Sequence, residues 1–311
     1  MSTDGQATVF IDGEAGTTGL GIRERLRHLP VTLRSIDPAL RKDTQARQEM
    51  MAAVDVVILC LPDDAAREAV GLADAMGSDA PRILDASTAF RTDPAWVYGF
   101  PEMDAAQPDA IRQAARVSNP GCYPTGLIAL LRPLVNAGLV PAGYPVCVNA
   151  ISGYSGGGRS MIEAHERAGG PAFELYGLGL GHKHIPEMAL YAGLAQAPVF
   201  VPSVGHFPQG MIVSVPLHLD RLPGHVRVAD LHAALAAHYA GSDRIAVAEP
   251  CAKLVADGLA GTDRMELRVH GNDDLAQAVL TARLDNLGKG ASGAALQNLA
   301  LMLGLEPPPP V

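Results

Sequence analysis

The stretch TVFIDGEAGTTG, residues 8–19, decides the fold of this chain. Residues 8–12 are a short apolar run that predicts a β-strand, and Gly13, Gly16 and Gly19 follow it before a helical pattern begins. A glycine-rich turn between a strand and a helix lets backbone N–H groups approach a pyrophosphate, because the helix N-terminus favours anions. The stretch therefore predicts the start of a dinucleotide-binding unit.

The glycine spacing leaves one alternative open. It is G-x-x-G-x-x-G rather than the more common G-x-G-x-x-G, so by itself it is also compatible with a tight turn that holds no ligand. Its place at the start of an alternating strand and helix pattern favours the nucleotide interpretation. The candidate cofactor-binding residues of this turn are Gly13, Ala15, Gly16, Thr17, Thr18 and Gly19.

Strands and helices continue to alternate through the first third of the chain. Residues 64–76 have the spacing of a helix, and apolar runs predict strands at residues 31–34, 54–60 and 82–85. Continuous apolar strands between helices are typical of a parallel sheet covered on both faces. We therefore expect residues 1–120 to form a Rossmann-type α/β domain.

The pattern changes after about residue 117. A helix is predicted at residues 124–138, and longer, more alternating strands follow at residues 210–219, 265–269 and 277–284. Such alternation is typical of antiparallel sheets. Residues 121–285 are therefore expected to form an α+β catalytic and oligomerisation domain with an antiparallel-rich sheet.

The length of the chain agrees with two domains, because 311 residues exceed the ~100–150 typical of one. The last predicted helix, residues 290–303, is apolar and must be buried somewhere. We expect the segment 286–311 to return to the first domain and complete it.

Composition and charge exclude several classes of protein. With 48% hydrophobic residues the chain is not a disordered protein, and 33 acidic against 24 basic residues give a net charge of −9, which disfavours nucleic-acid partners. No apolar stretch approaches the ~20 residues of a membrane span and no secretory signal is visible, so no membrane partner is expected. Four cysteines without a C-x-x-C pair exclude a disulfide scaffold, and a cytoplasmic location is expected.

The end of the second predicted strand should select the cofactor. An acidic residue there would bind a ribose 2′-hydroxyl, whereas arginine accommodates a 2′-phosphate. Arg34 and Ser35 come first and favour NADP, while Asp37 keeps NAD open. Arg34 could also be a solvated cation at the end of a strand.

The stretch SNPGCYPTG, residues 118–126, carries the candidate nucleophile Cys122. Prolines and glycine predict a rigid turn followed by an apolar helix, and a thiolate at a helix N-terminus is stabilised by the dipole and the free amides. A purely structural cysteine is the alternative. Cys60 and Cys147 lie in apolar runs and are expected to be buried strand thiols, and Cys251 has no assignment.

Six blocks of the sequence resemble the short form of the N-acetyl-gamma-glutamyl-phosphate reductases, which are related to aspartate-semialdehyde and glyceraldehyde-phosphate dehydrogenases. The blocks span residues 12 to about 298, nearly the whole chain. They are DGEAGTTG at 12–19, DASTAFR at 85–91, NPGCYPT at 119–125, SGYSGGGR at 152–159, HKHIPEM at 182–188 and DNLGKGASG at 285–293.

The resemblance implies an NADPH-dependent reduction of N-acetyl-L-glutamyl 5-phosphate in arginine biosynthesis, by a homo-oligomer, dimer or tetramer. Cys122 would displace phosphate, and the thioester would accept a hydride to give the semialdehyde. His184 and His182 are the candidate bases, with His184 favoured and His206 a third candidate. A metal site formed by His182, His184 and Glu187 is an alternative.

Further site residues follow from the matched blocks. Arg91 and Arg159 are expected to bind the anionic substrate, Asn119 to donate to its acyl oxygen, and the Gly121 and Cys122 amides to stabilise an oxyanion. Either arginine could instead be a surface residue. The remaining substrate candidates are Ser152, Gly153 and Glu187, and the remaining NADP candidates are Leu61, Pro62, Ser87, Asn286, Lys289 and Gly290.

Three other functions remain open at this stage. An aspartate-semialdehyde dehydrogenase would perform the same chemistry on a shorter acyl phosphate. A nucleotide-sensing regulator would need no thiolate, and a cysteine hydrolase would need no dinucleotide turn.

Overall fold

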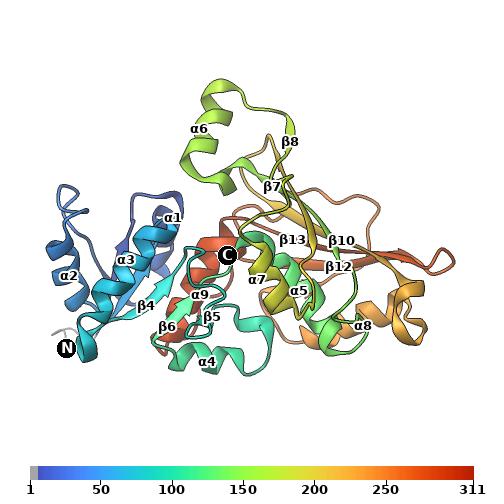
Figure 1. Ribbon diagram of the computed structural model, residues 1–311, viewed down its shortest axis with the longest axis horizontal. Coiled ribbons are helices and arrows are strands. Elements are labelled where there is room, and N and C mark those ends of the chain that lie inside the picture. Colours follow the sequence, from blue (N-terminus) through green and yellow to red (C-terminus); the bar gives the residue numbers. More distant parts are fainter. Residues whose placement is uncertain (1–5) are drawn as a thin grey trace. The chain divides into compact units, whose positions relative to one another are not determined.

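The computed structural model describes residues 6–311, and the chain folds into two units. Unit 1 contains the described part of Met1–Pro120 together with Ala291–Pro308. Unit 2 contains Gly121–Gly290 and Pro309–Val311. Figure 1 shows the elements of both units.

The sheet of unit 1 has six strands, and every pair in it is parallel. Its spatial order is β2-β1-β3-β4-β6-β5. The strands are β1 (Ala7–Asp12), β2 (Val31–Arg34), β3 (Val56–Leu59), β4 (Arg82–Asp85), β5 (Val97–Tyr98) and β6 (Arg116–Ser118). This arrangement confirms the Rossmann-type prediction for the first part of the chain.

Helices cover both faces of this sheet because successive strand side chains point to opposite faces. Val9 and Ile11 pack in one core with α1 (Thr17–Arg25) and α9 (Gly293–Met302). Phe10 packs in the other core with α2 (Thr44–Ala52) and α3 (Asp63–Asp74). The remaining helix is α4 (Gln107–Gln113).

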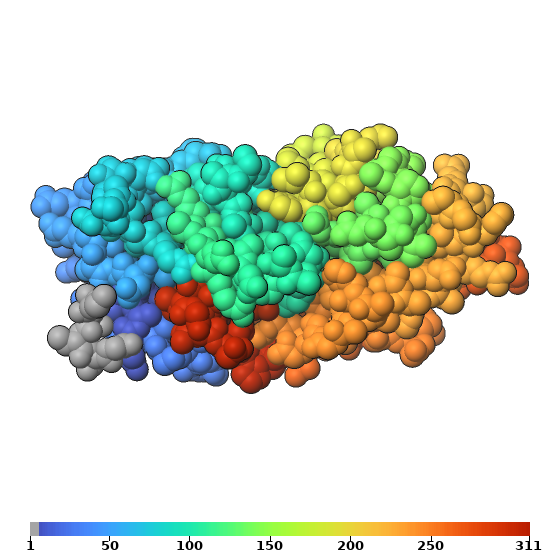
Figure 2. Space-filling model, turned by 90° about the horizontal axis from the view of Figure 1, so that it is seen from below, coloured from blue at the N-terminus to red at the C-terminus, as the bar shows by residue number. Residues whose placement is uncertain are grey.

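The last helix of the chain belongs to unit 1. Every residue of α9 is buried, and it contacts α1, α4 and β4. In the space-filling view the red C-terminal residues lie against blue and teal segments from the first 120 residues (Figure 2). A mostly apolar helix needs such a position, and its two polar residues are bonded there: Gln297 donates to Glu102 and Asn298 to the Gly99 carbonyl.

The sheet of unit 2 has seven strands in the order β11-β12-β13-β10-β7-β9-β8. Pairs β7–β9 and β11–β12 are parallel and the other four are antiparallel, which confirms the antiparallel-rich prediction. The strands are β7 (Cys147–Gly153), β8 (Phe173–Leu175), β9 (Val199–Gly205), β10 (Met211–His218), β11 (Ile245–Val247), β12 (Met265–Asn272) and β13 (Gln277–Leu284).

Two helices cover one face of this sheet. They are α5 (Cys122–Asn136), which contacts β10 and β13, and α8 (Val228–His238), which contacts β11 and β12. The other helices of the unit are α6 (Gly158–Ala168) and α7 (Ile185–Ala192). Along β10 buried residues alternate with more exposed ones, so the second face of the sheet is left to polar and exposed side chains.

The prediction that Cys147 is buried is wrong. It is exposed at the start of β7, on the uncovered face of the sheet, while its neighbour Val148 is fully buried. The apolar run around Cys147 does not reveal this, because only one of the two faces of the strand is covered. Cys60, at the end of β3, is partly buried, and burial raises the pKa of its thiol.

Candidate active site

Cys122 is the first residue of α5 and is partly buried. Gly121 precedes it in an extended conformation as the N-cap, and Pro124 falls in the first helical turn, where a missing N–H costs nothing. The sulfur therefore lies beside the first-turn amides and the positive end of the dipole of a helix of 15 residues. This environment favours a thiolate.

Glu187 connects the cysteine loop to α7. Its Oε1 accepts a hydrogen bond of 2.8 Å from the Gly121 N–H, and the side chain is only 2% exposed. The carboxylate predicted to bind substrate is thus directed at the protein's own backbone. The Gly121 amide predicted to stabilise an oxyanion is also engaged in this contact, so Glu187 holds the backbone that precedes Cys122.

The two motif histidines lie next to each other, with ring centroids 4.7 Å apart. The backbone N–H of His184 donates to Nδ1 of His182 at 3.1 Å. Because that nitrogen accepts, a neutral His182 carries its proton on Nε2. Burial, aided by the charge of Lys183, lowers the pKa of His182 and favours this neutral form.

Tyr123 brings both histidines to the cysteine loop. Its ring centroid lies 6.2 Å from that of His182 and 6.1 Å from that of the buried His184. The hydroxyl donates to the Ser203 carbonyl at 3.1 Å and accepts from the Tyr176 hydroxyl at 3.2 Å. Burial raises the pKa of Tyr123 and raises that of Tyr176 to about 12, so both remain neutral. Sequence reasoning missed Tyr176, which lies outside every motif block.

Gly290 packs directly against Cys122. A Cβ at this position would lie 2.9 Å from Cys122 Cβ and 3.0 Å from the Asp285 carbonyl. The glycine belongs to the π-helical turn Gly288–Ser292, a distortion that is common at functional sites. Lys289 beside it is 1% exposed. Both residues were predicted to bind cofactor, and Gly290 is here a neighbour of the cysteine.

Asn286 holds two loops of unit 2 together. Its Nδ2 donates to Ser155 Oγ at 2.9 Å, and its Oδ1 accepts from the Gly210 N–H at 2.9 Å. Both functional atoms of this predicted cofactor residue therefore have protein partners. Ser152 and Gly153 end β7 in the same region, and a Cβ at Gly153 would lie 2.6 Å from the Pro208 carbonyl.

A cavity of about 500 Å³ lies at the glycine-rich turn of unit 1. Gly13 has φ +94°, and a Cβ there would lie 2.3 Å from the Cys60 carbonyl, so only glycine fits this close approach. Of the predicted cofactor residues, the lining contains Gly13, Ala15, Gly16, Leu61 and Pro62. Thr17, Thr18 and Gly19 form the first turn of α1, whose N-terminus begins at this lining.

The cations of this cavity are not the ones predicted. Arg23, Arg41 and Lys42 line it, whereas Arg34 is absent from its lining in the described chain. The Arg34 side chain falls on an exposed position of β2. Arg41 and Lys42 lie in the loop before α2, and the sequence signal that could have identified them is a pair of cations directly before a helix.

The acidic residues of the cavity already have partners. Glu14 forms an ion pair of 2.7 Å with Arg23 and accepts a hydrogen bond of 3.3 Å from Ser35 Oγ. Asp12 accepts from Arg47 at 2.8 and 3.0 Å, in a pair that is buried on both sides. Burial raises the pKa of Asp12 although Arg47 opposes this.

Arg91 and Asn119 are part of the frame of unit 1. Arg91 is 7% exposed and donates to the Asn119 carbonyl at 2.9 Å and to the Ala86 carbonyl at 3.1 Å. The Asn119 side chain donates to the Ala291 carbonyl at 3.1 Å and accepts from Asn298 at 3.0 Å. Arg91 thus holds the segment that leads to the cysteine.

Ser87 donates to Asp85 at the end of β4, over 2.7 Å. Asp85 is fully buried, and this burial raises its pKa to about 6 although the hydrogen bonds of Ser87 oppose the shift. Arg159, by contrast, is an exposed residue in the first turn of α6. His206 follows β9 and contacts His165.

Within residues 6–311 no three His, Cys, Asp or Glu side chains form a cluster that could hold a metal ion. Within the same residues no helix is long and apolar enough to cross a membrane.

Comparison with known proteins gives a consistent result. Residues 122–286 match a family model described as the semialdehyde dehydrogenase dimerisation domain, and residues 24–114 match the semialdehyde dehydrogenase NAD binding domain. An N-acetyl-gamma-glutamyl-phosphate reductase of a Chelativorans species is 55% identical over 96% of this chain and 98% of its own length. N-acetyl-gamma-glutamyl-phosphate reductase 2 of Pseudomonas putida is 51% identical over 95% and 96%.

Solved structures show the same fold. Aspartate semialdehyde dehydrogenase II of Vibrio cholerae, in a complex with ASA, superposes with a TM-score of 0.71 at 16% identity, over 96% of this chain and 98% of that one. The aspartate semialdehyde dehydrogenase of Francisella tularensis gives 0.72 at 11% identity, over 96% and 100%.

Proposed function

Because this chain belongs to the N-acetyl-gamma-glutamyl-phosphate reductase family, we propose that it reduces N-acetyl-L-glutamyl 5-phosphate to N-acetyl-L-glutamate 5-semialdehyde and phosphate, with NADPH as the reductant, in arginine biosynthesis. The observation that carries the proposal is the position of Cys122. It begins a long helix, and Tyr123 beside it contacts both motif histidines.

Cys122 performs the covalent chemistry. Its thiolate attacks the acyl carbon, the C–O bond to phosphate breaks, and inorganic phosphate leaves with that electron pair. Bound NADPH supplies a hydride. Once the thioester carbon has accepted it, the thiohemiacetal collapses, the C–S bond breaks, and the aldehyde is released with the thiolate restored.

The histidines divide the proton chemistry between them. His182 uses Nδ1 to accept the backbone N–H of His184, so its Nε2–H remains as a donor to an anionic substrate group. We assign proton transfer to the imidazole of His184, which is buried and fixed at the start of α7. Glu187, one turn further, is a positioning residue for the cysteine loop.

The residues of the unit 1 cavity fit NADP. The N-terminus of α1 and the glycine-rich turn offer backbone N–H groups to the pyrophosphate, and Gly13 allows the close approach. Arg41 and Lys42 offer charge for the 2′-phosphate, and Glu14 is already held by Arg23. We therefore assign 2′-phosphate recognition to Arg41 and Lys42 rather than to Arg34 and Ser35.

For the substrate's anionic groups we retain Arg159 as the cationic ligand. It is exposed at the start of α6, the first helix after Ser152 and Gly153. Arg91 is given a positioning role instead, because it holds the backbone of Asn119.

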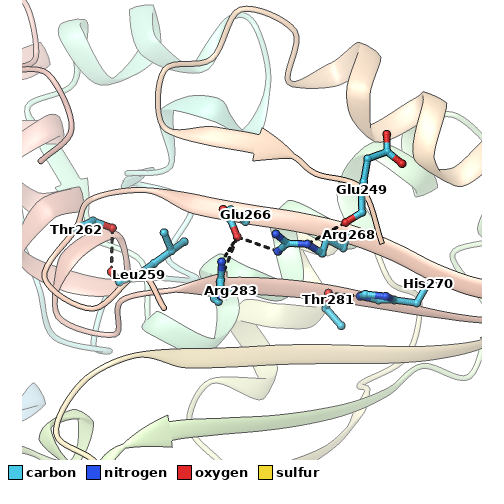
Figure 3. Close-up of polar contacts among 8 residues, drawn as sticks. All are labelled: Glu249, Leu259, Thr262, Glu266, Arg268, His270, Thr281 and Arg283. Atoms are coloured by element: carbon cyan, nitrogen blue, oxygen red, sulfur yellow. Dashed lines mark hydrogen bonds and ion pairs between the residues drawn. The ribbon is translucent and has the colours of Figure 1, made fainter. Parts of the chain in front are cut away.

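We further propose that the protein is a homodimer formed through the uncovered face of the unit 2 sheet. The family model for this region is described as a dimerisation domain. Figure 3 shows part of this face, where Glu266 accepts from Arg268 at 2.8 Å and from Arg283 at 3.1 Å. Burial alone would raise the pKa of Glu266, but these hydrogen bonds outweigh it and lower the pKa. The members of this network are only 12% to 26% exposed because loop residues of the same chain lie against them: the Glu249 carbonyl accepts from Arg268, and Gly258 packs on Arg283.

A cytoplasmic location is proposed on chemical grounds. The mechanism requires Cys122 as a free thiol, and the exposed Cys147 and Cys251 are free thiols as well. A reducing compartment preserves all three.

The reaction in reverse tests the activity. N-acetylglutamate 5-semialdehyde, phosphate and NADP should give NADPH and acyl phosphate, whereas aspartate semialdehyde should be a much poorer substrate. Equal or greater turnover of aspartate semialdehyde would overturn the assignment of substrate.

A further inference from the structure

Two histidines that the proposed mechanism does not use lie ring against ring in unit 2. His165 Nδ1 and His206 Nδ1 are 2.9 Å apart, and the ring centroids are separated by 5.2 Å. Tyr154 stacks on His165 at 4.8 Å, with the two rings within 17° of parallel. A hydrogen bond between the two Nδ1 atoms requires that one carries a proton and the other does not.

The contact between His165 and His206 holds α6 against the rest of unit 2. Among the described residues of that helix only His165 is buried. Glycines lie at both ends: Gly158 has φ +73° and Gly169 has φ +74°, conformations that favour glycine and allow the chain to bend. Gly170 fits closely over the imidazole, since a Cβ there would lie 2.5 Å from His165 Nδ1. Figure 1 shows α6 at one end of the unit, beside β8 and beyond β7.

The histidine pair is close to the residue that follows the nucleophile. Strands β7 and β9 run parallel and end together at Gly153 and Gly205. The next residue of each, Tyr154 and His206, belongs to the stacked cluster. Just before the end of β9, the Ser203 carbonyl accepts from the Tyr123 hydroxyl at 3.1 Å. The end of β9 therefore contacts both the cysteine loop, through Tyr123, and α6, through His206.

We propose that His165 and His206 form a proton-sensitive latch that holds α6, and with it Arg159, in the position used to bind the acyl phosphate substrate. The proposal rests on the substrate role assigned to Arg159 above. When both rings are cationic, every ring nitrogen carries a proton, neither Nδ1 can accept, and two positive charges face each other. The latch then opens, and substrate binding weakens while the cysteine site keeps its geometry.

Other charged groups around the pair have less influence. Tyr154 contacts both rings. Glu163, Glu166 and Arg167 on α6 and Glu174 on β8 are all exposed, so solvent and salt screen their charges.

The test compares KM and kcat of four proteins in the reverse reaction between about pH 5.5 and 8, the range in which histidine titrates. In the wild type, KM for N-acetylglutamate 5-semialdehyde should rise roughly tenfold on acidification, the effect of one lost charge-assisted contact, whereas the fall of kcat caused by protonation of the catalytic groups should be the same in His206→Asn. His206→Asn should remove this rise, because a carboxamide can donate to or accept from His165. His206→Ala should have a high KM at every pH, and Arg159→Ala should as well.

Hydrogen exchange of residues 158–168 gives a readout that does not depend on turnover. Exchange rates are corrected for their intrinsic dependence on pH. Protection of residues 158–168 should then fall at acid pH in the wild type, persist at acid pH in His206→Asn, and be absent at every pH in His206→Ala. His165→Phe, which keeps the ring stacked on Tyr154, should behave like His206→Ala if that variant does not fold.

An acid rise of KM in His206→Asn equal to that of the wild type would overturn the latch. A loss of hydrogen-exchange protection of residues 158–168 on addition of a chelator such as EDTA at neutral pH would also overturn the latch, because His165 and His206 would then hold a metal. A wild type that lacks turnover at neutral pH but shows the expected protection would contradict the proposed function and leave the latch supported.

Discussion

The neighbours of Cys122, the proposed nucleophile, leave its side chain little freedom. Glu187 fixes the amide before it, Gly290 closes the space at its Cβ, and Tyr123 places two imidazoles beside it. None of these three residues needs to react. They determine where the sulfur lies, and displacement of a reacting atom by about 1 Å can cost about 10²-fold in rate.

Gly290→Ala should therefore lower kcat by about 10²-fold and slow alkylation of Cys122 by iodoacetamide, because the added methyl group would lie 2.9 Å from Cys122 Cβ. Gly71→Ala is the matched control, since a Cβ at that helical glycine meets nothing within 4 Å. Alkylation is followed by mass spectrometry of the Cys122 peptide, because the exposed Cys251 also reacts. Wild-type kcat in Gly290→Ala would contradict the packing argument.

The two motif histidines should separate kinetically. His184→Asn should reduce kcat by roughly 10²–10⁴-fold, the usual contribution of general acid–base catalysis. His182→Asn should mainly raise KM, because the Nε2–H assigned to substrate binding is lost. At neutral pH His206→Asn should cost less than tenfold in kcat, since His206 pairs with His165. If kcat collapsed in His206→Asn while His184→Asn stayed near wild type, the general base would be His206 rather than His184.

At the scale of elements, the loop between β2 and α2 should determine the preference for NADP. Arg41→Ala and Lys42→Ala should each weaken NADPH binding about tenfold, through loss of one charge-assisted contact, and leave NADH binding nearly unchanged. Arg34→Ala is the control from the neighbouring strand end, with little expected effect on either nucleotide. Titration by nucleotide fluorescence measures all three. If Arg34→Ala alone selectively weakened NADPH binding, the residue that binds the 2′-phosphate would be Arg34, at the end of β2.

The carboxyl end of β4 should make stability depend on pH. Asp85 is fully buried with its pKa raised to about 6, so its contribution to folding is present below the ordinary carboxyl pKa and is lost as pH rises through 6. Asp85→Asn keeps an acceptor for Ser87 and removes the ionisation. Relative to the wild type, its free energy of unfolding should gain up to roughly 3 kcal/mol between acid and alkaline pH.

Urea unfolding at about pH 5 and 8 should show roughly half of this difference, because the carboxyl of the unfolded chain is already largely ionised at pH 5, and Asp79→Asn is an exposed control in the same unit. A stability difference between Asp85→Asn and the wild type that does not change with pH would show that Asp85 is ionised throughout.

At the scale of the whole molecule, the spacing of apolar residues along the sequence predicts most of the strands and helices. Strands β1 to β4 lie where apolar runs predict them; β1, β3 and β4 are mostly buried on both faces and therefore apolar, whereas the edge strand β2 alternates half-buried and exposed residues. The predicted helix at residues 64–76 is α3, Asp63–Asp74. The resemblance to the family also points to Cys122, His182 and His184, and in the fold both histidines lie beside Tyr123, the residue that follows Cys122.

Three features could not be obtained from the sequence because they depend on tertiary geometry. Cys147 is exposed since one face of its sheet has no helix over it, which an apolar run cannot indicate. Glu187 and Asn286 turn toward backbone and side-chain partners far away in sequence. Arg41 and Lys42 reach the cavity through the path of a loop, which no periodicity describes.

The most direct test of the central claim is a reaction of the enzyme with N-acetylglutamate 5-semialdehyde and NADP in the absence of phosphate. Hydride transfer should then proceed but release of the acyl group should not, so rapid mixing should show a burst of one NADPH per active site. Mass spectrometry should find the N-acetylglutamyl group on the Cys122 peptide, and added phosphate should remove it. A Cys122→Ser enzyme should bind NADPH and give no burst. An adduct on another residue, or steady turnover without a burst or adduct, would contradict the thioester mechanism.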